Sequence, residues 1–456
     1  MYSNVKRLGV AGALAVVLTA IAAANASAFV PAPEGCSMSH CDVRMSDVVD
    51  LEAPASVEST WFDPGAWSMS QGLGCVSNGE RVACTNGDRF GSTAQPSLRV
   101  YAADGTLLWH SGKELNSWAW TSVPIMNRRG SVIMADDERI VRFAPDGTVR
   151  WSTPTPGGRP ISPTRTADGT IVLATSQGPI SAYDPKTGEL LGTLDLTDRF
   201  GGLPGRFDTR NTPAVRGNRI YVSTEFKLLR RLPDPGNHAA LFAIDIVRTA
   251  PPDERLKIAW KFEFGARSGA SPLRVGRMLV FDGDRESPTA PRDPRFFGVI
   301  DRGDHPELVW QYGLGGPGVA SAAQDPRGCA WVFAFGDPIL RRISTRDGAV
   351  LQTIDLDAAV GEFGIHTPYS AMNVAEGPGG HPVMLVTARA SIFSVYVVAL
   401  DLVTGELVWK HRMPGLALTS TPMGQFPIVA GPGDRRTVVF SMKGGVRAVS
   451  GPVAAP

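Results

Sequence analysis

Short apolar runs separated by polar turn residues recur along the chain, seen best in residues 397–409. Val398 and Leu400 alternate on the way into this stretch, and Leu407 and Trp409 on the way out. Between them, Asp401 can hydrogen-bond the backbone of a turn, and Gly405 can supply the positive φ that a reversal needs. The pattern therefore predicts two short strands joined by a tight turn.

The same hairpin pattern recurs along the whole chain. Further copies occupy residues 100–109, 141–151, 181–191, 242–260, 298–310 and 342–351. Upstream of the hairpins stands a small hydroxyl residue, often followed by proline, as in Ser122, Ser162, Thr212, Ser271, Thr367 and Thr421. A strand, a turn and a second strand follow each one, which gives four strands per unit. Trp109 and Trp151 are 42 residues apart, a spacing typical of propeller blades.

The two ends of the repeat region predict a closed ring. The last unit, from Thr421 to Val449, lacks a fourth strand, and an isolated strand at residues 57–61 could supply it. Closure of this kind removes the exposed sheet edges that would otherwise aggregate. The sequence thus predicts an all-β, eight-bladed β-propeller with four-stranded antiparallel blades. Seven blades is the alternative if the divergent fourth and fifth units are divided wrongly.

The first residues have the features of an export signal. Lys6 and Arg7 precede an uncharged apolar run at residues 8–24, and Ala26, Ser27 and Ala28 form a small-residue cleavage site before Phe29. An uncleaved membrane anchor is the competing interpretation. We expect a signal peptide at residues 1–28, an N-terminal arm at 29–55 and the propeller at 56–450. The mature protein would be periplasmic or extracellular, without a transmembrane span.

Charge excludes some partners. Removal of Lys6 and Arg7 with the signal changes the formal net charge from +1 to −1. A nearly neutral chain gives no reason to expect binding to nucleic acid or to anionic membrane surfaces. We expect a monomer.

The cysteines are disulfide candidates, because an exported protein meets an oxidising compartment. Cys36 and Cys41 lie close in sequence, as do Cys75 and Cys84, and bridges between the two pairs are equally admissible. A two-residue turn at Asn78 would make Cys75 and Cys84 diagonal neighbours, which would strain a bridge between them. The histidine between Cys36 and Cys41 could suggest copper or zinc, but a small disulfide loop is favoured and no metal is predicted.

The repeat unit, with Ala399 and Asp401 before Thr404, Gly405, Glu406 and Trp409, resembles the pyrroloquinoline-quinone (PQQ) repeat. This resemblance implies the eight-bladed quinoprotein-like propeller, a superfamily that includes PQQ-dependent dehydrogenases and non-enzymatic propellers of outer-membrane assembly. The chain has no adjacent cysteine pair, no evident calcium-and-quinone constellation and no Cys-x-x-Cys-His haem site. It is therefore expected to be closer to the assembly-type propellers. No cofactor is predicted, and PQQ with calcium is the alternative.

Long insertions fall mostly on one face of the predicted propeller. Residues 192–210 and 355–365 precede inner strands, whereas 226–237 and 283–295 join second and third strands; these connections share a face, which we call the long-loop face. Residues beside the starts of the inner strands should line a central funnel there. The candidates are Trp67, Trp120, Arg210, Asn211, Arg267, Ser268, His366 and Ser420.

The function expected from the sequence is that of an exported binding or assembly scaffold. Its partner, a protein or a small molecule, would bind on the long-loop face. The alternative is a PQQ-dependent or related oxidoreductase with its site in the central funnel, where arginines could bind an anionic or carbonyl ligand. The sequence identifies no catalytic residue, and a purely structural role for the funnel residues is the competing interpretation.

Overall fold

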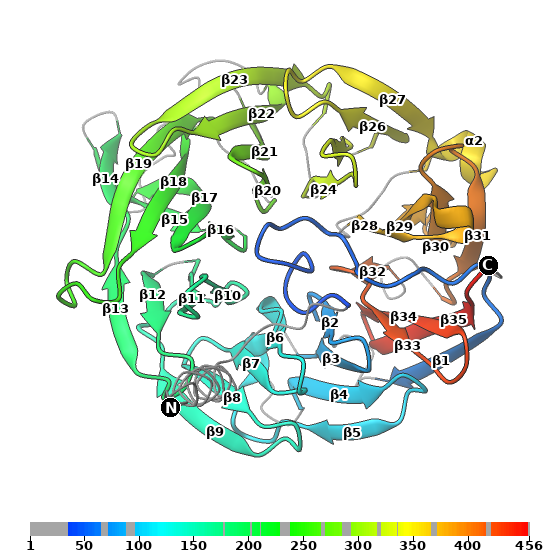
Figure 1. Cartoon of the computed structure of the whole chain (residues 1–456), viewed down its shortest axis with the longest axis horizontal. Helices are drawn as coiled ribbons and strands as arrows, with labels where there is room; N and C mark the ends of the chain where they lie inside the picture. Colours follow the sequence, from blue (N-terminus) through cyan, green and yellow to red (C-terminus); the bar gives the residue numbers. More distant parts are fainter. Residues whose placement is uncertain are drawn as a thin grey trace, which may run out of the picture.

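A computed structural model shows a ring of β-sheets around a central channel (Figure 1). It describes residues 35–64, 72–87, 96–176, 178–200, 203–209, 211–228, 238–265, 270–284, 293–316, 321–334, 336–365, 372–415 and 421–454. Eight antiparallel sheets are present in this described part of the chain, and each forms one blade. The predicted all-β, eight-bladed propeller is thus confirmed.

The blades follow one another in sequence, each beginning with a strand at the channel. Blade 1 comprises β2 (Cys75–Ser77), β3 (Arg81–Thr85), β4 (Leu98–Ala102) and β5 (Leu107–His110). After the 3₁₀ helix η1 (Ser117–Thr121), blade 2 comprises β6 (Ile125–Met126), β7 (Val132–Ala135), β8 (Arg139–Phe143) and β9 (Val149–Pro154). Blade 3 comprises β10 (Thr164–Arg165), β11 (Ile171–Leu173), β12 (Ile180–Tyr183) and β13 (Leu190–Leu194).

Blade 4 is the largest sheet because an extra hairpin joins it. That hairpin is β14 (Thr197–Phe200) and β15 (Leu203–Thr209), and the blade itself is β16 (Ala214–Arg216), β17 (Arg219–Leu228), β18 (Ala239–Ile246) and β19 (Leu256–Phe264). Blade 5 comprises β20 (Leu273–Val275), β21 (Met278–Asp284), β22 (Pro294–Asp301) and β23 (Pro306–Gly313). Blade 6 comprises β24 (Ala323–Gln324), β25 (Ala330–Val332), β26 (Ile339–Ile343) and β27 (Val350–Asp355), and the short helix α2 (Leu356–Val360) follows.

The last two blades complete the ring. Blade 7 comprises β28 (Asn373–Glu376), β29 (Pro382–Arg389), β30 (Val395–Asp401) and β31 (Leu407–Arg412), with the 3₁₀ turn η2 (Pro378–Gly380) after β28. Blade 8 comprises β32 (Pro422–Met423), β33 (Ile428–Ala430), β34 (Arg435–Met442), β35 (Gly445–Pro452) and β1 (Ser59–Pro64). Because β1 pairs antiparallel with β35, an N-terminal strand closes the ring, as the sequence predicts.

The hairpin of residues 397–409 forms the outer half of blade 7. Ala399 pairs with Trp409, and the register shifts at Leu400, where a bulge precedes the turn. Val397 and Ala399 lie in a cluster with residues of blade 8, whereas Val398 and Leu400 lie in a cluster with residues of blade 6. Both faces of the strand are therefore buried, so its apolar residues run without interruption.

The repeated tryptophans connect each blade to the next. The Nε1–H of Trp109 donates to the carbonyl of Pro145 at 3.0 Å, and that of Trp310 donates to the carbonyl of Thr345 at 2.8 Å. The Trp109 ring also packs on Gly147, whose φ is 85° and where a Cβ would lie 2.9 Å from the ring. The turn glycine is thus required twice, for its backbone conformation and for contact with the preceding blade.

Both disulfides join cysteines that are near in sequence, Cys36 with Cys41 and Cys75 with Cys84. The expected diagonal placement of Cys75 and Cys84 is wrong, because the two are direct register partners. The turn lies one residue later than expected: the backbone N–H of Asn78 donates to the carbonyl of Arg81, so Gly79 and Glu80 are its central residues in place of Asn78 and Gly79. This shift by two residues in the pairing puts the two cysteines opposite each other.

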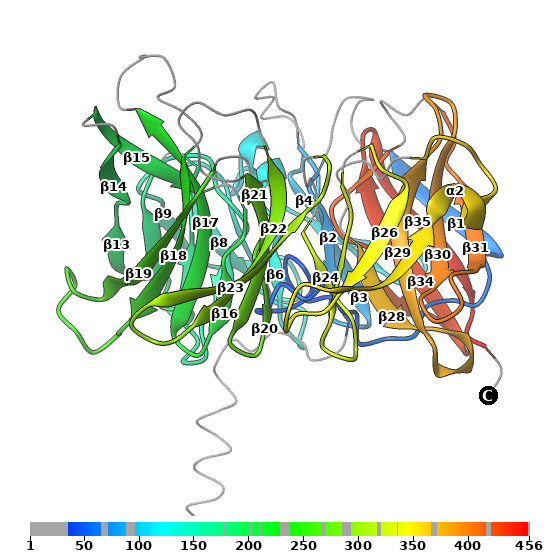
Figure 2. The same ribbon diagram turned by 90° about the horizontal axis from the view of Figure 1, so that it is seen from above.

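The insertions extend from both faces of the ring. Figure 2 shows β14 and β15 rising at one face, while the hairpin between β18 and β19 extends at the other. The predicted loop at 192–210 is therefore largely a hairpin, and its β15 pairs with β17. No helix in the described residues is long and apolar enough to cross a membrane.

Candidate functional site

The first part of the N-terminal arm, residues 35–49, lies inside the central channel, and residues 50–55 leave it between blades 7 and 8 towards the rim (Figure 1, dark blue). Met38, Met45 and Asp47 have no exposed surface there. The Cys36–Cys41 disulfide closes a small loop at the start of the arm and is itself buried. The channel is therefore filled at this level by the chain itself.

Most inner strands bind the arm through one backbone N–H each. Each of these N–H groups donates to a carbonyl of the arm at 2.7 or 2.8 Å. In blade order, the donor and acceptor residues are Ser77 and Cys36, Met126 and Ser37, Val215 and Val43, Arg274 and Arg44, Gln324 and Ser46, and Val374 and Asp47. In blade 8 a side chain replaces the backbone donor. Gln425 donates its Nε2–H to the carbonyl of Met38, and its Oε1 accepts the N–H of His40. The arm thus follows the ring and bonds to successive blades.

The arm is held in an unusual backbone conformation. Among the described residues, the non-glycine residues with positive φ are His40, Cys41, Met45 and Asp47, and all four belong to the arm. L-residues rarely adopt this conformation, so it persists only where the surroundings fix it. Asn373 helps to fix this conformation. Its Nδ2 lies 3.2 Å from both Cys41 Sγ and the Asp47 carbonyl oxygen, and its Oδ1 accepts the Phe426 N–H at 2.6 Å.

A buried polar chain crosses the channel at the tip of the disulfide loop. His40 Nδ1 lies 2.9 Å from Asp47 Oδ2, and His40 Nε2 lies 3.3 Å from Ser321 Oγ. Burial raises the pKa of Asp47, while His40 acts in the opposite direction. The order of groups is that of a Ser–His–Asp triad. However, Ser321 Oγ already accepts the backbone N–H of Ser271 at 2.8 Å.

That contact has an equivalent elsewhere in the ring. Ser162 Oγ accepts the backbone N–H of Val123 at 2.9 Å, so a hydroxyl at the start of one blade bonds the preceding blade. Ser162 and Ser321 therefore each bond the segment that enters the preceding blade. We assign Ser321 this structural role, and no catalytic residue is identified.

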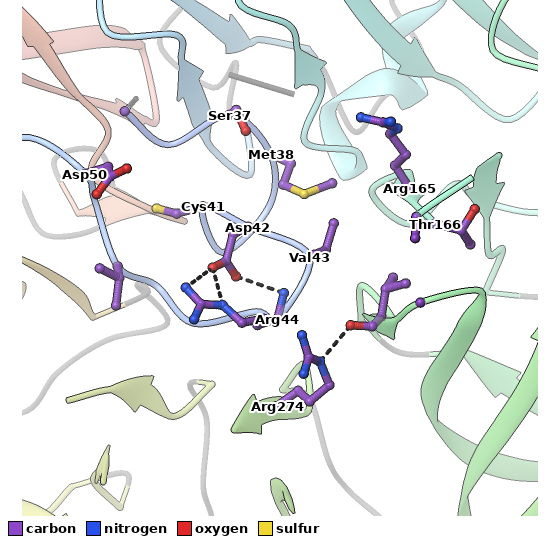
Figure 3. Close-up of a pocket in the computed structure, with 15 residues that line it drawn as sticks. Ser37, Met38, Cys41, Asp42, Val43, Arg44, Asp50, Arg165, Thr166 and Arg274 are labelled. Atoms are coloured by element: carbon purple, nitrogen blue, oxygen red, sulfur yellow. Dashed lines mark hydrogen bonds and ion pairs between the residues drawn. The ribbon is translucent and has the colours of Figure 1, made fainter. Parts of the chain in front are cut away.

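A cavity of about 420 Å³ opens between the arm and blades 3 to 5 (Figure 3). Arg44, Arg165 and Arg274 line it together with Asp42 and Asp50, and Met38, Val43 and Val215 form its apolar wall. Burial lowers the pKa of both Arg165 and Arg274. The lining therefore combines an excess of positive charge with an apolar surface.

The three arginines differ in their partners. Arg44 donates Nε–H to Asp42 at 2.8 Å, and Arg274 donates to the carbonyls of Val215 and Gly276. Arg165 Nε is buried and has no hydrogen-bond partner within the described part of the chain. In Figure 3, accordingly, dashed lines reach Arg44 and Arg274 but not Arg165.

Only two of the predicted funnel residues lie among the described residues. Trp120 ends η1, and its carbonyl accepts the N–H of Leu73. Asn211 accepts the N–H of Thr212, whose hydroxyl donates to Ser39 of the arm, so Asn211 is beside the channel. Trp67, Arg210, Arg267, Ser268, His366 and Ser420 lie outside the described residues, and their placement in a funnel stays a prediction.

The described channel residues do not fit a quinone with calcium. The arm fills the space between the inner strands, and two of its carboxylates are engaged: Asp47 by His40, and Asp42 by Arg44 and Ser46. Nor do the described residues contain a group of three or more His, Cys, Asp or Glu side chains that could hold a metal. We therefore derive no step through such a cofactor.

Sequence reasoning missed the arm's position and the arginine cavity. Cys36, His40 and Cys41 stand out in the sequence, but nothing there shows that they enter the channel. Arg165 has no distinguishing motif at all.

Comparison with known proteins supports the fold. The family model for outer membrane protein assembly factor BamB matches residues 53–238. A europium-containing methanol dehydrogenase is 12% identical with a TM-score of 0.56, over 92% of this chain and 98% of that one. A quinohemoprotein alcohol dehydrogenase from Comamonas testosteroni is 10% identical with a TM-score of 0.61, over 94% and 82%. No match was found among the curated proteins.

A third similar structure is the computationally designed Ika8 protein, 12% identical with a TM-score of 0.54, over 87% of this chain and 99% of that one. At these identities the likeness concerns the fold alone. Blade number, ring closure, the hairpin repeat and the family-model match all agree. The chain therefore has the eight-bladed propeller fold, and over residues 53–238 it is similar to the family model of the assembly factor BamB.

Proposed function

We propose that the protein is an exported binding or assembly scaffold of the cell envelope or the extracellular space. The observation that carries this proposal is an apolar patch, Phe363, Ile392 and Phe393. These side chains are 91%, 59% and 60% exposed, the highest values among the large apolar residues in the described part of the chain. Exposed apolar residues that gather at one place are typical of protein-binding surfaces.

The patch lies on the long-loop face. Phe363 follows α2 and precedes the inner strand of blade 7, while Ile392 and Phe393 join the second and third strands of that blade. The Tyr396 hydroxyl donates to Glu362 Oε1 at 2.7 Å, which holds the two segments together. A rigid ring thus presents neighbouring apolar side chains on two loops, an arrangement suited to a protein partner.

The filled channel favours a scaffold over an oxidoreductase. The arm takes up the space between the inner strands, and its polar groups find partners within the chain. The family-model match to an outer-membrane assembly factor over residues 53–238 supports the same choice. A PQQ-dependent or related oxidoreductase with a site in the funnel is the alternative, and the dehydrogenases of similar fold are its support.

Site-specific photo-crosslinking in the cells that make the protein tests the proposal. A photoreactive amino acid is placed at Phe363 or Phe393, and at Val247 on the opposite face as the control; Val247 is 45% exposed. The scaffold predicts one shared protein adduct from positions 363 and 393 that is absent at 247. Adducts that are equal at all three positions, or absent at 363 and 393, contradict a partner on this face.

A further inference from the structure

Blade 3 is exceptional in the way the ring binds the arm. For each of the other blades, the described residues include a hydrogen bond to the arm, from a backbone N–H or from Gln425. None of the described arm residues accepts a hydrogen bond from the inner strand of blade 3. Instead, the cavity separates this strand from the arm, and Met38 and Val43 are among the arm residues that line it.

The strand register identifies the backbone N–H of blade 3 that has no acceptor in the arm. Met126 pairs with Val132 in blade 2, and Gln324 pairs with Ala330 in blade 6; both donate their N–H to an arm carbonyl. In blade 3, Arg165 has the equivalent position, since it pairs with Ile171. The residues after Arg165 also form the same turn, in which the Thr166 N–H donates to the Thr170 carbonyl. The N–H of Arg165 therefore faces the channel, where the other blades meet a carbonyl oxygen.

The Arg165 side chain adds to this unused donor. Arg165 is a half-buried residue of the cavity lining, and its Nε has no acceptor among the described residues. Asp168, three residues along the turn, interacts with Arg165 electrostatically. Its carboxylate is bound by Thr166 and Thr170, at 2.6 and 2.8 Å, and no hydrogen bond to Arg165 is present. No carboxylate is therefore hydrogen-bonded to the Arg165 guanidinium within the described residues, and an anion in the cavity would supply the missing charge partner.

We propose that this cavity binds a carboxylate, held by the backbone N–H and the guanidinium of Arg165. The carboxylate oxygen takes the place that an arm carbonyl has in the neighbouring blades. A monoanion fits better than phosphate, because the lining carries three arginines against two aspartates and Arg44 is already paired with Asp42. Val43, Val48 and Ala167 are the apolar lining residues with accessible surface, and they accommodate a short aliphatic chain attached to it.

This binding site goes beyond the proposed function and does not depend on it, because it lies at the arm and not at the apolar patch. The ligand is a free small carboxylate or the C-terminal carboxylate of a peptide, which share their chemistry. Charge-assisted bidentate contacts make arginine the residue suited to either one.

Ligand-observed saturation-transfer NMR on the purified mature protein tests the proposal with butyrate and with neutral butyramide. Butyrate is expected to bind saturably and butyramide not to bind. R165Q, which gives blade 3 the residue found at 324 in blade 6, is expected to weaken butyrate binding about tenfold or more. The control R327Q removes one exposed arginine from the turn of blade 6 and is expected to leave binding unchanged.

Two further experiments complete the test. A tripeptide ending in valine, as the free acid and as the amide, distinguishes a peptide C-terminus from a free small carboxylate; preference for the acid over the amide assigns the former. Protection of Arg165 from phenylglyoxal by butyrate, followed by mass spectrometry, needs no variant. Equal binding of butyrate and butyramide, tighter binding of inorganic phosphate, or no protection of Arg165 would overturn the proposal.

Discussion

The most informative single substitution is Asn373→Ala, because this side chain fixes the arm to two blades. Asn373 is fully buried at the start of β28, and it contacts Cys41 and Asp47 of the arm as well as the N–H of Phe426 in blade 8. Alanine leaves the buried Phe426 N–H without its acceptor, which costs about 1–3 kcal/mol. The space left by the side chain adds about 1 kcal/mol. We expect the free energy of unfolding to fall by about 3 kcal/mol.

Urea denaturation measures this loss, and hydrogen exchange at the arm amides shows where it acts. Asn86→Ala is the matched control, because Asn86 is also buried but its Nδ2 has no hydrogen-bond partner in the described structure. It should cost about 1 kcal/mol and leave arm exchange unchanged. The reasoning is refuted if Asn373→Ala costs no more than the control, or if the arm amides exchange equally slowly in both variants.

Three other predictions concern the ring itself. Trp409→Phe removes a 2.7 Å hydrogen bond from Nε1–H to an arm carbonyl and should cost about 1 kcal/mol more in urea denaturation than Trp331→Phe, whose Nε1 has no acceptor among the described residues. Burial raises the pKa of Asp301, but hydrogen bonds from neighbouring side chains and a backbone N–H outweigh it and lower this pKa to about 2. The folded state therefore favours the carboxylate, so this contribution to stability is present above the ordinary pKa near 4 and is lost as the pH falls towards 2. Asp301→Asn should flatten the fall in stability over that range, and an unchanged slope would contradict the assignment. Replacing both cysteines of the Cys75–Cys84 disulfide by serine should lower the free energy of unfolding by about 2–3 kcal/mol, whereas an unchanged denaturation midpoint would show that the bridge contributes nothing.

Sequence reasoning was sufficient for features that depend on local pattern. The hairpin ending in Trp409 is encoded by alternation and by a turn glycine, and its repetition determines the blades. Closure by the strand before the first blade follows from the unpaired edge of the last one. The physical cause of the hairpin lies within about a dozen consecutive residues, and closure follows from counting the strands of each unit.

The arm's position could not be predicted, because it depends on contacts between distant residues. The Ser46 carbonyl meets the N–H of Gln324, and backbone groups carry no sequence signal. His40 and Ser321 are near each other only because the arm enters the ring. Arg165 is distinguished only by the fact that the arm leaves its blade without a partner, which requires the path of the arm to be known.

The register error at Cys75 has a simpler cause. The Asn78 side chain accepts the N–H groups of Glu80 and Arg81, which stabilises a turn centred on Gly79 and Glu80 where the Asn-Gly pair suggested one centred on Asn78 and Gly79. Choosing between these two turns decides whether the cysteines are opposite or diagonal.

The central claim is that the channel is filled by the protein's own arm and does not work as a quinone site. Titration of the purified mature protein with PQQ and calcium, followed by quinone absorbance and dye-linked alcohol oxidation, tests it most directly. The account predicts no saturable quinone binding and no turnover. Saturable binding accompanied by turnover would contradict it and would establish the oxidoreductase alternative.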